Sequence, residues 1–273
     1  MQEREHFLYK FIKAEHAELC IANGSIVATE LGFSNDPLEN SPAFESSNIP
    51  QQKEEWRKIQ EKLLPRVVCL TSRISVSAMW GHYADQHKGV VLAYNLKKIQ
   101  ELAQDRGLYI YKCVYKNERI PISQEELNLL QKNEDDKITD IQEQLKGKLL
   151  NLRAQKSKDW EYEQEIRLDV SDSKDVHPEN RQWIFTNLKP CLSGVILGKN
   201  CSLREPYIRK LLEHHGYTPD IQVERARESM THLVIETGIF GDMPAEKYNE
   251  LDISNINTNT ITPKPRIPLI SFD

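Results

Sequence analysis

MWGHYADQHKGVVL, residues 79–92, crowds aromatic and hydrogen-bonding side chains between two apolar runs of the chain. The run VVCLTS at 67–72 precedes it and GVVLAY follows at 89–94. Both runs are short and β-branched, which is typical of buried strands. We therefore expect the segment between them to be a short helix or loop at the mouth of a sheet, a common place for ligand sites. The alternative is an aromatic corner in which His82 and Tyr83 only satisfy buried backbone groups.

The composition favours a globular protein without a membrane segment. The chain has 273 residues, of which 39% are hydrophobic, enough for one large domain or two small ones. No apolar run approaches the ~20 residues that cross a bilayer, and the first residues lack a signal-peptide pattern, so we expect a cytoplasmic location. The net charge of −5 gives no overall attraction to nucleic acid. Five scattered cysteines without a C-x-x-C pair indicate neither disulfides nor a zinc site.

Hydrophobic periodicity predicts one mixed α/β domain over residues 1–240 and a flexible polar tail over 241–273. The expected strands fall at 7–11, 25–29, 67–72, 89–94, 160–170, 192–198, 221–226 and 233–235. The expected helices fall at 14–22, 51–64, around 138–152 and at 206–215. A capping box at 123–126 begins a further helical segment.

The alternating pattern of residues 160–170 predicts a strand with one charged face. That face would carry Glu161, Glu163, Glu165, Arg167 and Asp169. Two neighbouring carboxylates raise each other's pKa unless a cation separates them, so we expect a raised pKa for Glu163 or Glu165, opposed by Arg167 or Lys10. One carboxylate can then hold a hydroxyl while the other orients a nucleophile. The alternative is a solvated face whose charges pair across the ladder.

Several common catalytic motifs are absent from the sequence. There is no G-x-S-x-G nucleophile elbow and no glycine-rich phosphate loop. His82 and His87 are five residues apart, which does not match the i, i+4 spacing of a helical zinc site. We expect no metal.

Five motifs occur in a characteristic order. They are LYKF at 8–11, SNDPLE at 34–39, CLTS at 69–72, MWGHYADQHKG at 79–89 and KDWEYEQEIR at 158–167. With this order and spacing, the chain resembles the bacterial family called domain of unknown function 2971 over residues 1 to about 240. The name of that family states that its function is not established.

A polar first strand, a hydroxyl-bearing middle strand and a later Glu-x-Glu are also similar to the three-part signature of ADP-ribosyltransferases. This resemblance implies an α+β fold in which a mixed, largely antiparallel split sheet with flanking helices clamps NAD as a substrate. Glu165 would be the catalytic glutamate that anchors the nicotinamide ribose, and Glu163 would orient the acceptor. Ser72 would be the middle element, and Tyr9 or Lys10 the first, where most such enzymes have Arg or His. The remaining expected pocket residues are Asn35, Asp36, Trp80, His82 and Tyr83.

The same resemblance implies transfer of ADP-ribose to a macromolecule, protein or nucleic acid, in a bacterial toxin or anti-phage role, in which an antitoxin or regulatory partner would fit. Two other classes stay open: a metal-dependent hydrolase or nuclease using Asp36, His82 and Glu165, and a non-catalytic module of a defence system that binds a nucleotide or a protein. The ADP-ribosyltransferase hypothesis makes a geometric prediction. One pocket should be lined by Tyr9, Ser72, His82, Tyr83 and Glu165.

Overall fold

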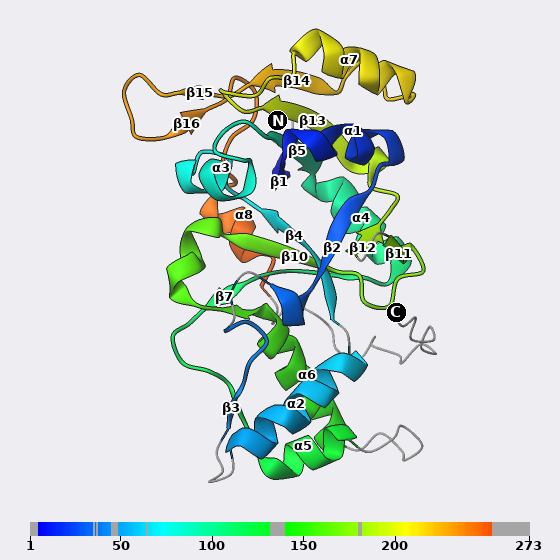
Figure 1. Cartoon of the computed structure of the whole chain (residues 1–273), viewed down its shortest axis with the longest axis vertical. Helices are drawn as coiled ribbons and strands as arrows, with labels where there is room; N and C mark the ends of the chain where they lie inside the picture. Colours follow the sequence, from blue (N-terminus) through cyan, green and yellow to red (C-terminus); the bar gives the residue numbers. More distant parts are fainter. Residues whose placement is uncertain are drawn as a thin grey trace.

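The protein consists of a large twisted sheet with a group of helices at one end (Figure 1). The computed structural model describes residues 5–34, 36, 38–44, 49–63, 65–131, 140–179 and 182–252. Asn35 lies outside the described residues, and so do residues 253–273 of the expected tail. None of the helices in the described part is long and apolar enough to cross a membrane.

The main sheet is mixed and mostly antiparallel, which confirms the predicted α+β class. Its strand order is β11-β12-β2-β4-β1-β5-β13-β14. In addition, β10 pairs with β4 and β6 pairs with β10, and the only parallel pair of this sheet among the described strands is β13 with β14. The strands are β1 (Phe7–Ile12), β2 (Ile26–Glu30), β4 (Arg66–Thr71), β5 (Val90–Asn95), β6 (Tyr109–Lys112), β10 (Glu165–Asp169), β11 (Val176–Glu179), β12 (Gln182–Phe185), β13 (Leu192–Leu197) and β14 (Gln222–Arg225).

The sheet forks at β4. One edge of β4 pairs with β10 along its whole length, from Thr71 opposite Glu165 to Val67 opposite Asp169. The other edge is shared between two strands, because Thr71 faces Tyr9 of β1 whereas Val67 faces Thr29 of β2. The strands β1 and β2 therefore diverge over the middle of β4, and this split leaves room between them.

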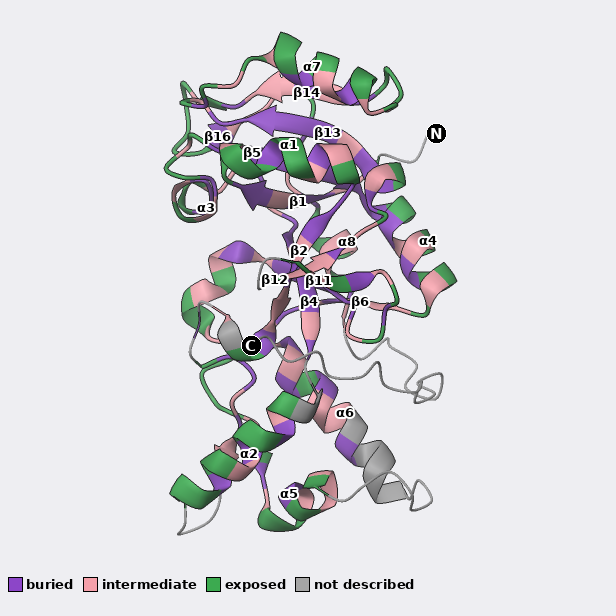
Figure 2. Ribbon diagram, turned by 45° about the vertical axis from the view of Figure 1, so that its right-hand side comes forward, coloured by how far each residue is buried: buried purple, intermediate pink, exposed green. Residues whose placement is uncertain are grey.

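Alternate residues of β1 point into two separate cores, as the period of two requires. On one face, Leu8 joins α1 (Ala14–Asn23), α4 (Leu96–Arg106) and α7 (Glu205–His214). On the other, Tyr9 packs with α3 (Ser77–Tyr83). The strands between the two cores are buried over most of their length (Figure 2). As expected, Gly24 ends α1 in the left-handed conformation, with φ of 58°.

The helices α2 (Ile49–Leu63), α5 (Gln124–Gln131) and α6 (Asp140–Ala154) form a helical lobe beyond β4 (Figure 1). Two short parallel ladders connect it to the sheet: β3 (Ala43–Phe44) with β8 (Pro121–Ile122), and β7 (Val114–Tyr115) with β9 (Gln155–Lys156). Trp56 and Leu127 belong to its small apolar core. The predicted capping box is present, since Ser123 and Glu126 exchange side-chain to backbone hydrogen bonds of 2.8 and 3.2 Å.

Two predicted boundaries differ from the structure by several residues. The strand expected at 160–170 begins only at Glu165, because residues 158–163 form a 3-10 helix, η2, and Gln164 adopts a φ of 40° that breaks the alternation. The packed region also continues past 241: the Tyr9 hydroxyl donates to the carbonyl of Gly241, and α8 (Ala245–Asn249) follows. Residues 241–252 thus belong to the folded domain.

The remaining described elements are peripheral. They are the 3-10 helices η1 (Leu31–Phe33) and η3 (Lys189–Cys191) and the hairpin strands β15 (Arg227–Glu228) and β16 (Ile235–Glu236). In place of the strand expected at 233–235, the structure has the two-residue strand β16.

Candidate functional site

A cavity of about 250 Å³ lies at the fork of the sheet. Its walls come from β1, β2 and β4, from α3, from the loop after η1, and from the junction of β9, η2 and β10. Segments separated by most of the chain therefore meet here, because β4 is the central strand on which β1, β2 and β10 all pair.

Three cavity residues stand in one row across adjacent strands. Glu165 of β10 is opposite Thr71 of β4, and Thr71 is opposite Tyr9 of β1. The row comes from backbone register alone, so it is fixed by the sheet and not by side-chain choice. All three side chains line the cavity.

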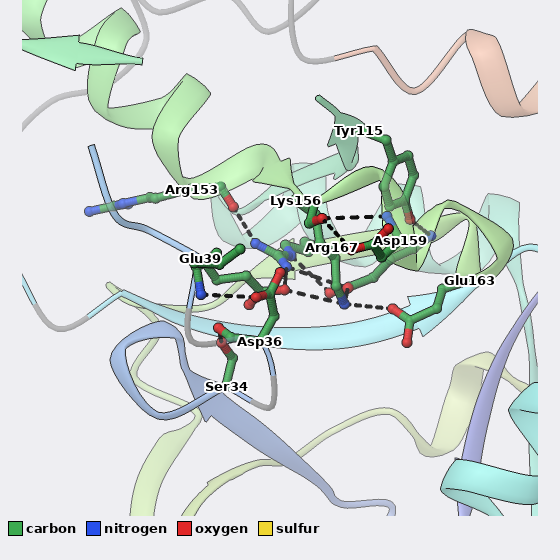
Figure 3. A network of polar contacts seen from close by, with 12 residues as sticks. Ser34, Asp36, Glu39, Tyr115, Arg153, Lys156, Asp159, Glu163 and Arg167 are labelled. Carbon is green, nitrogen blue, oxygen red and sulfur yellow. Dashed lines mark hydrogen bonds and ion pairs between the residues drawn. The ribbon is translucent and has the colours of Figure 1, made fainter. Parts of the chain in front are cut away.

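A buried network of charges closes one end of the cavity (Figure 3). The Lys156 ammonium lies 2.5 Å from a carboxylate oxygen of Glu163 and 2.6 Å from one of Glu165. A third carboxylate, that of Glu39, is 3.2 Å away. Each of these side chains is less than a tenth exposed.

Arg167 is the second cation of this network. Its Nε donates to Glu165 at 2.8 Å and its Nη2 to Glu39 at 2.9 Å. Its Nη1 donates to the carbonyl of Arg153, at the end of α6 (Figure 3). A buried guanidinium needs such complete pairing, because an unpaired buried charge is costly.

This environment shifts the pKa values of the two glutamates in opposite directions. Burial raises the pKa of Glu163 above its ordinary value, and Lys156 and the Tyr83 hydroxyl offset this only in part. Burial would also raise the pKa of Glu165, but Arg167 and Lys156 together hold it well below the usual range. The expected raised pKa is thus found at Glu163, but the opposing cation is Lys156 and not Arg167 or Lys10.

Tyr83 connects the network to α3. Its hydroxyl donates to Glu163 at 2.5 Å, and its ring contributes to the cavity wall. On the opposite side Lys10 lines the cavity from β1, and its ammonium donates to the Cys69 carbonyl at 3.0 Å. The structure therefore brings together half of the predicted site residues: Tyr9, Lys10, Tyr83, Glu163 and Glu165.

Ser72 does not line the cavity. Its side chain is fully buried and donates to the Oε1 of Gln164 at 2.9 Å. The preceding residue, Thr71, lines the cavity, and its hydroxyl donates to the backbone carbonyl of Glu163. Of these two adjacent hydroxyl residues, Thr71 is therefore the one that lines the cavity.

Trp80 and His82 also lie away from the cavity lining. Trp80 is fully buried, meets Phe11 edge to face and donates from its indole nitrogen to the Ile74 carbonyl at 2.8 Å. It is a core residue. His82 is exposed and its ring lies 6.4 Å from that of Tyr83.

Asp36 has a local structural role. It is buried, and its Oδ1 accepts a hydrogen bond from the backbone of Leu38 at 2.9 Å. Such an Asx turn shapes the loop that presents Ser34 and Glu39 to the cavity. Of the trio Asp36, His82 and Glu165 that the hydrolase reading requires, only Glu165 lines the cavity. Across the described part of the chain, no cluster of three or more His, Cys, Asp or Glu residues is arranged to hold a metal ion.

Sequence reasoning missed Glu39, Thr71 and Lys156. Lys156 follows the helix expected around 138–152, and the β7–β9 ladder, which no local pattern predicts, positions it at the cavity. Glu39 belongs to the recognised 34–39 motif but was not singled out within it. For Thr71, the usable signal was the CLTS motif at 69–72, which carries both hydroxyl residues.

Comparison with known proteins gives a match to a family model over part of the chain. Residues 79–168 match the model of the family described as Protein of unknown function (DUF2971). No curated protein and no solved structure matches the chain. The DUF2971 match covers α3 through most of β10, and so includes Tyr83, Lys156, Glu163 and Glu165. The first-strand side of the cavity precedes it.

Proposed function

We propose that this protein transfers the ADP-ribosyl group of NAD to a macromolecular acceptor, with Glu165 as the catalytic residue. The observation that carries this proposal is the row of Glu165, Thr71 and Tyr9 on three adjacent strands at one cavity. These are the three elements on which the resemblance to ADP-ribosyltransferases rests, with Thr71 taking the place of Ser72.

The charge distribution of the cavity suits NAD. At the β10 end, the carboxylates of Glu39, Glu163 and Glu165 face the two cations Lys156 and Arg167, which leaves one negative charge in excess when all are ionised. The nicotinamide ring carries a positive charge and would be attracted to this end. Lys10, two strands away on β1, can contact a phosphate.

The size of the cavity admits only part of the dinucleotide. Sites for drug-sized ligands have volumes of roughly 300–1,000 Å³, and this cavity has about 250 Å³. We therefore place the nicotinamide ribose inside, against Glu165, and the adenylate half outside the fork. Tyr9 and Tyr83 would flank the nicotinamide half as aromatic walls.

The chemistry requires a carboxylate that is ionised at neutral pH. When the bond between the ribose C1′ and the nicotinamide nitrogen breaks, its electron pair leaves with nicotinamide and positive charge develops on the ribose. Arg167 and Lys156 keep Glu165 ionised and fixed in place, so that its charge is available for this step. The acceptor nucleophile then bonds to C1′ and gives up its proton.

Glu163 is suited to receive that proton. Its raised pKa brings it closer to neutral pH, which is the condition for an effective general base. It lies in the cavity wall beside Glu165 and is oriented by Tyr83. We further propose that the protein acts as a bacterial toxin or in anti-phage defence, where an antitoxin or regulatory partner would fit.

Release of nicotinamide tests the proposal. Purified protein is incubated with NAD and with bacterial lysate as a source of acceptors, and free nicotinamide is measured by chromatography. We expect release that depends on added protein and that falls when Glu165 is replaced by Gln. Absence of release from the wild type in every lysate would reject transfer.

One observation favours a second candidate, a non-catalytic module that binds a nucleotide or a protein. Both oxygens of Glu165 are occupied by Arg167 and Lys156, as in a purely structural ion network. Binding of NAD without nicotinamide release, measured by calorimetry, would select this candidate.

A further inference from the structure

Lys156 occupies a position that the backbone fixes firmly. It ends the short strand β9, where it is paired with Tyr115 of β7, and its carbonyl accepts a hydrogen bond from Lys116 at 3.0 Å. Its side chain crosses into the charged end of the cavity and is 7% exposed. The ammonium therefore reaches the glutamates from a rigid support and not from a flexible surface loop.

Among the described residues, Lys156 is the cation that contacts both glutamates of the pair. Arg167 bonds to Glu165 and Glu39, and its described ion pairs do not include Glu163. Glu163 and Glu165 come from different elements, η2 and β10, and Gln164 between them turns the chain through a left-handed conformation. Two buried carboxylates brought so close together repel each other strongly unless a cation lies between them.

We infer that Lys156 is the positioning residue of this pair: its ammonium group holds Glu163 and Glu165 side by side and facing the cavity. For catalysis this inference rests on the proposed function, but the geometric role belongs to the folded protein with or without NAD. Lys156 acts through the glutamates and is not itself assigned contact with the reacting atoms.

The role has a consequence for protonation. The groups that face Glu163 are Lys156 from β9, Tyr83 from α3, Glu165 from β10 and the neighbouring Tyr162 of η2, with Glu39 bonded to the same ammonium. Of these, Lys156 is the positive one, and it opposes the effect of burial. Its removal should leave Glu163 protonated to a higher pH.

NMR titration of the carboxyl carbons tests this directly in protein labelled with ¹³C-glutamate, with Glu163→Gln used to assign the signal. In Lys156→Met the midpoint of Glu163 should rise by roughly 1–3 pH units, the range for loss of an adjacent opposite charge. Lys156→Arg should stay near the wild type. Lys148→Met is the matched control, because it removes an ion pair with Glu126 in the helical lobe. A folded Lys156→Met protein in which Glu163 titrates as in the wild type would overturn the inference.

A second measurement does not need a variant that folds. In the wild type, the ¹⁵N signal of the Lys156 side chain should move through the same pH midpoint as the Glu163 carboxyl carbon, because the two groups share a hydrogen bond of 2.5 Å. Independent titration of the two signals would also overturn the inference.

The catalytic consequence is read separately. If nicotinamide is released, the acidic limb of the pH–rate profile of Lys156→Met should move to higher pH by the same interval as the Glu163 midpoint. In Lys156→Arg this limb should lie at the wild-type pH. An unmoved limb in folded Lys156→Met rejects the positioning role in catalysis. If the wild type releases none, the proposed function fails, while the two titrations still decide the role of Lys156.

Discussion

Glu163 and Glu165 lie on different secondary-structure elements, yet their carboxylates bind one and the same ammonium group, at 2.5 and 2.6 Å. The sharing is asymmetric. Glu165 has Arg167 as a second cation and its pKa is held low. Among the described residues, the Glu163 carboxylate pairs with Lys156 and the Tyr83 hydroxyl, and its pKa is raised. Environments that separate the pKa values of two neighbouring carboxyls are typical of acid and base pairs in active sites.

Lys10 should contribute to NAD binding in addition to its hydrogen bond with the Cys69 carbonyl. We expect Lys10→Met to weaken NAD binding by roughly tenfold or more, since a hydrogen bond to a charged group contributes about 1.5–3 kcal/mol. Calorimetric titration measures this. The control is Lys13→Met, which removes an exposed lysine just beyond the same strand, paired with Glu15 at 3.8 Å. Equal affinity in both variants would mean that Lys10 does not face the phosphates.

Trp80 and His82 should contribute very unequally to stability, although both belong to the same motif. Trp80→Ala removes a fully buried ring and should lower the free energy of unfolding by about 3–5 kcal/mol. His82→Ala alters an exposed side chain and should change it by less than about 0.5 kcal/mol. Urea denaturation compares the two. A comparable loss in both variants would contradict the core assignment of Trp80.

Asp242 should stabilise the protein in a pH-dependent way. It accepts hydrogen bonds from the backbone of Ile74 and Ser75 at 2.8 and 3.0 Å and pairs with Arg73. Burial alone would raise the pKa of Asp242, but the contacts with Ser75 and Arg73 lower it below the ordinary 3.8. The stabilisation is therefore complete above the pKa of the unfolded chain and is lost as the pH falls through the folded value.

The corresponding experiment compares wild type and Asp242→Asn by thermal or urea unfolding. At pH 7 the variant should be less stable by about 1–3 kcal/mol, the cost of disrupting hydrogen bonds to a charged group. The difference should shrink on acidification below about pH 4. A difference that stays constant down to pH 2 would show that the charge of Asp242 does not contribute.

Much of the fold was predictable from local patterns. The strands β1, β4 and β5 and the helices α1 and α7 have clear periodicity and stop signals, such as Gly24 after α1. The α4 helix was missed although the sequence carries its signals, since Asn95 caps its start and Gly107 ends it in the left-handed conformation. The pair β11 and β12 was missed because these short, partly polar strands depend on pairing with the rest of the sheet.

The site was only partly predictable. Tyr9 and Glu165 follow from strand alternation and the Glu-x-Glu motif, and the register of β4 joins them. Glu163 and Glu165 were predicted to share one face of a strand, and this was wrong. Glu163 lies in η2, and the φ of Gln164 between them brings the two carboxylates together. Ser157 caps η2 by accepting a hydrogen bond from Asp159, a helix-start signal that was present in the sequence. The position of Lys156 depends on long-range pairing that no local pattern reports.

The central claim is that the negative charge of Glu165 drives ADP-ribosyl transfer at the fork of the sheet. Its most direct test is transfer of label from NAD to lysate acceptors by equal amounts of folded wild type and Glu165→Gln, with folded fractions matched because Glu165 pairs two buried cations. Glu126→Gln, which breaks an ion pair in the helical lobe, serves as the control. We predict a loss of about 100-fold or more in Glu165→Gln and a wild-type rate in the control. Undiminished transfer by folded Glu165→Gln would contradict the account.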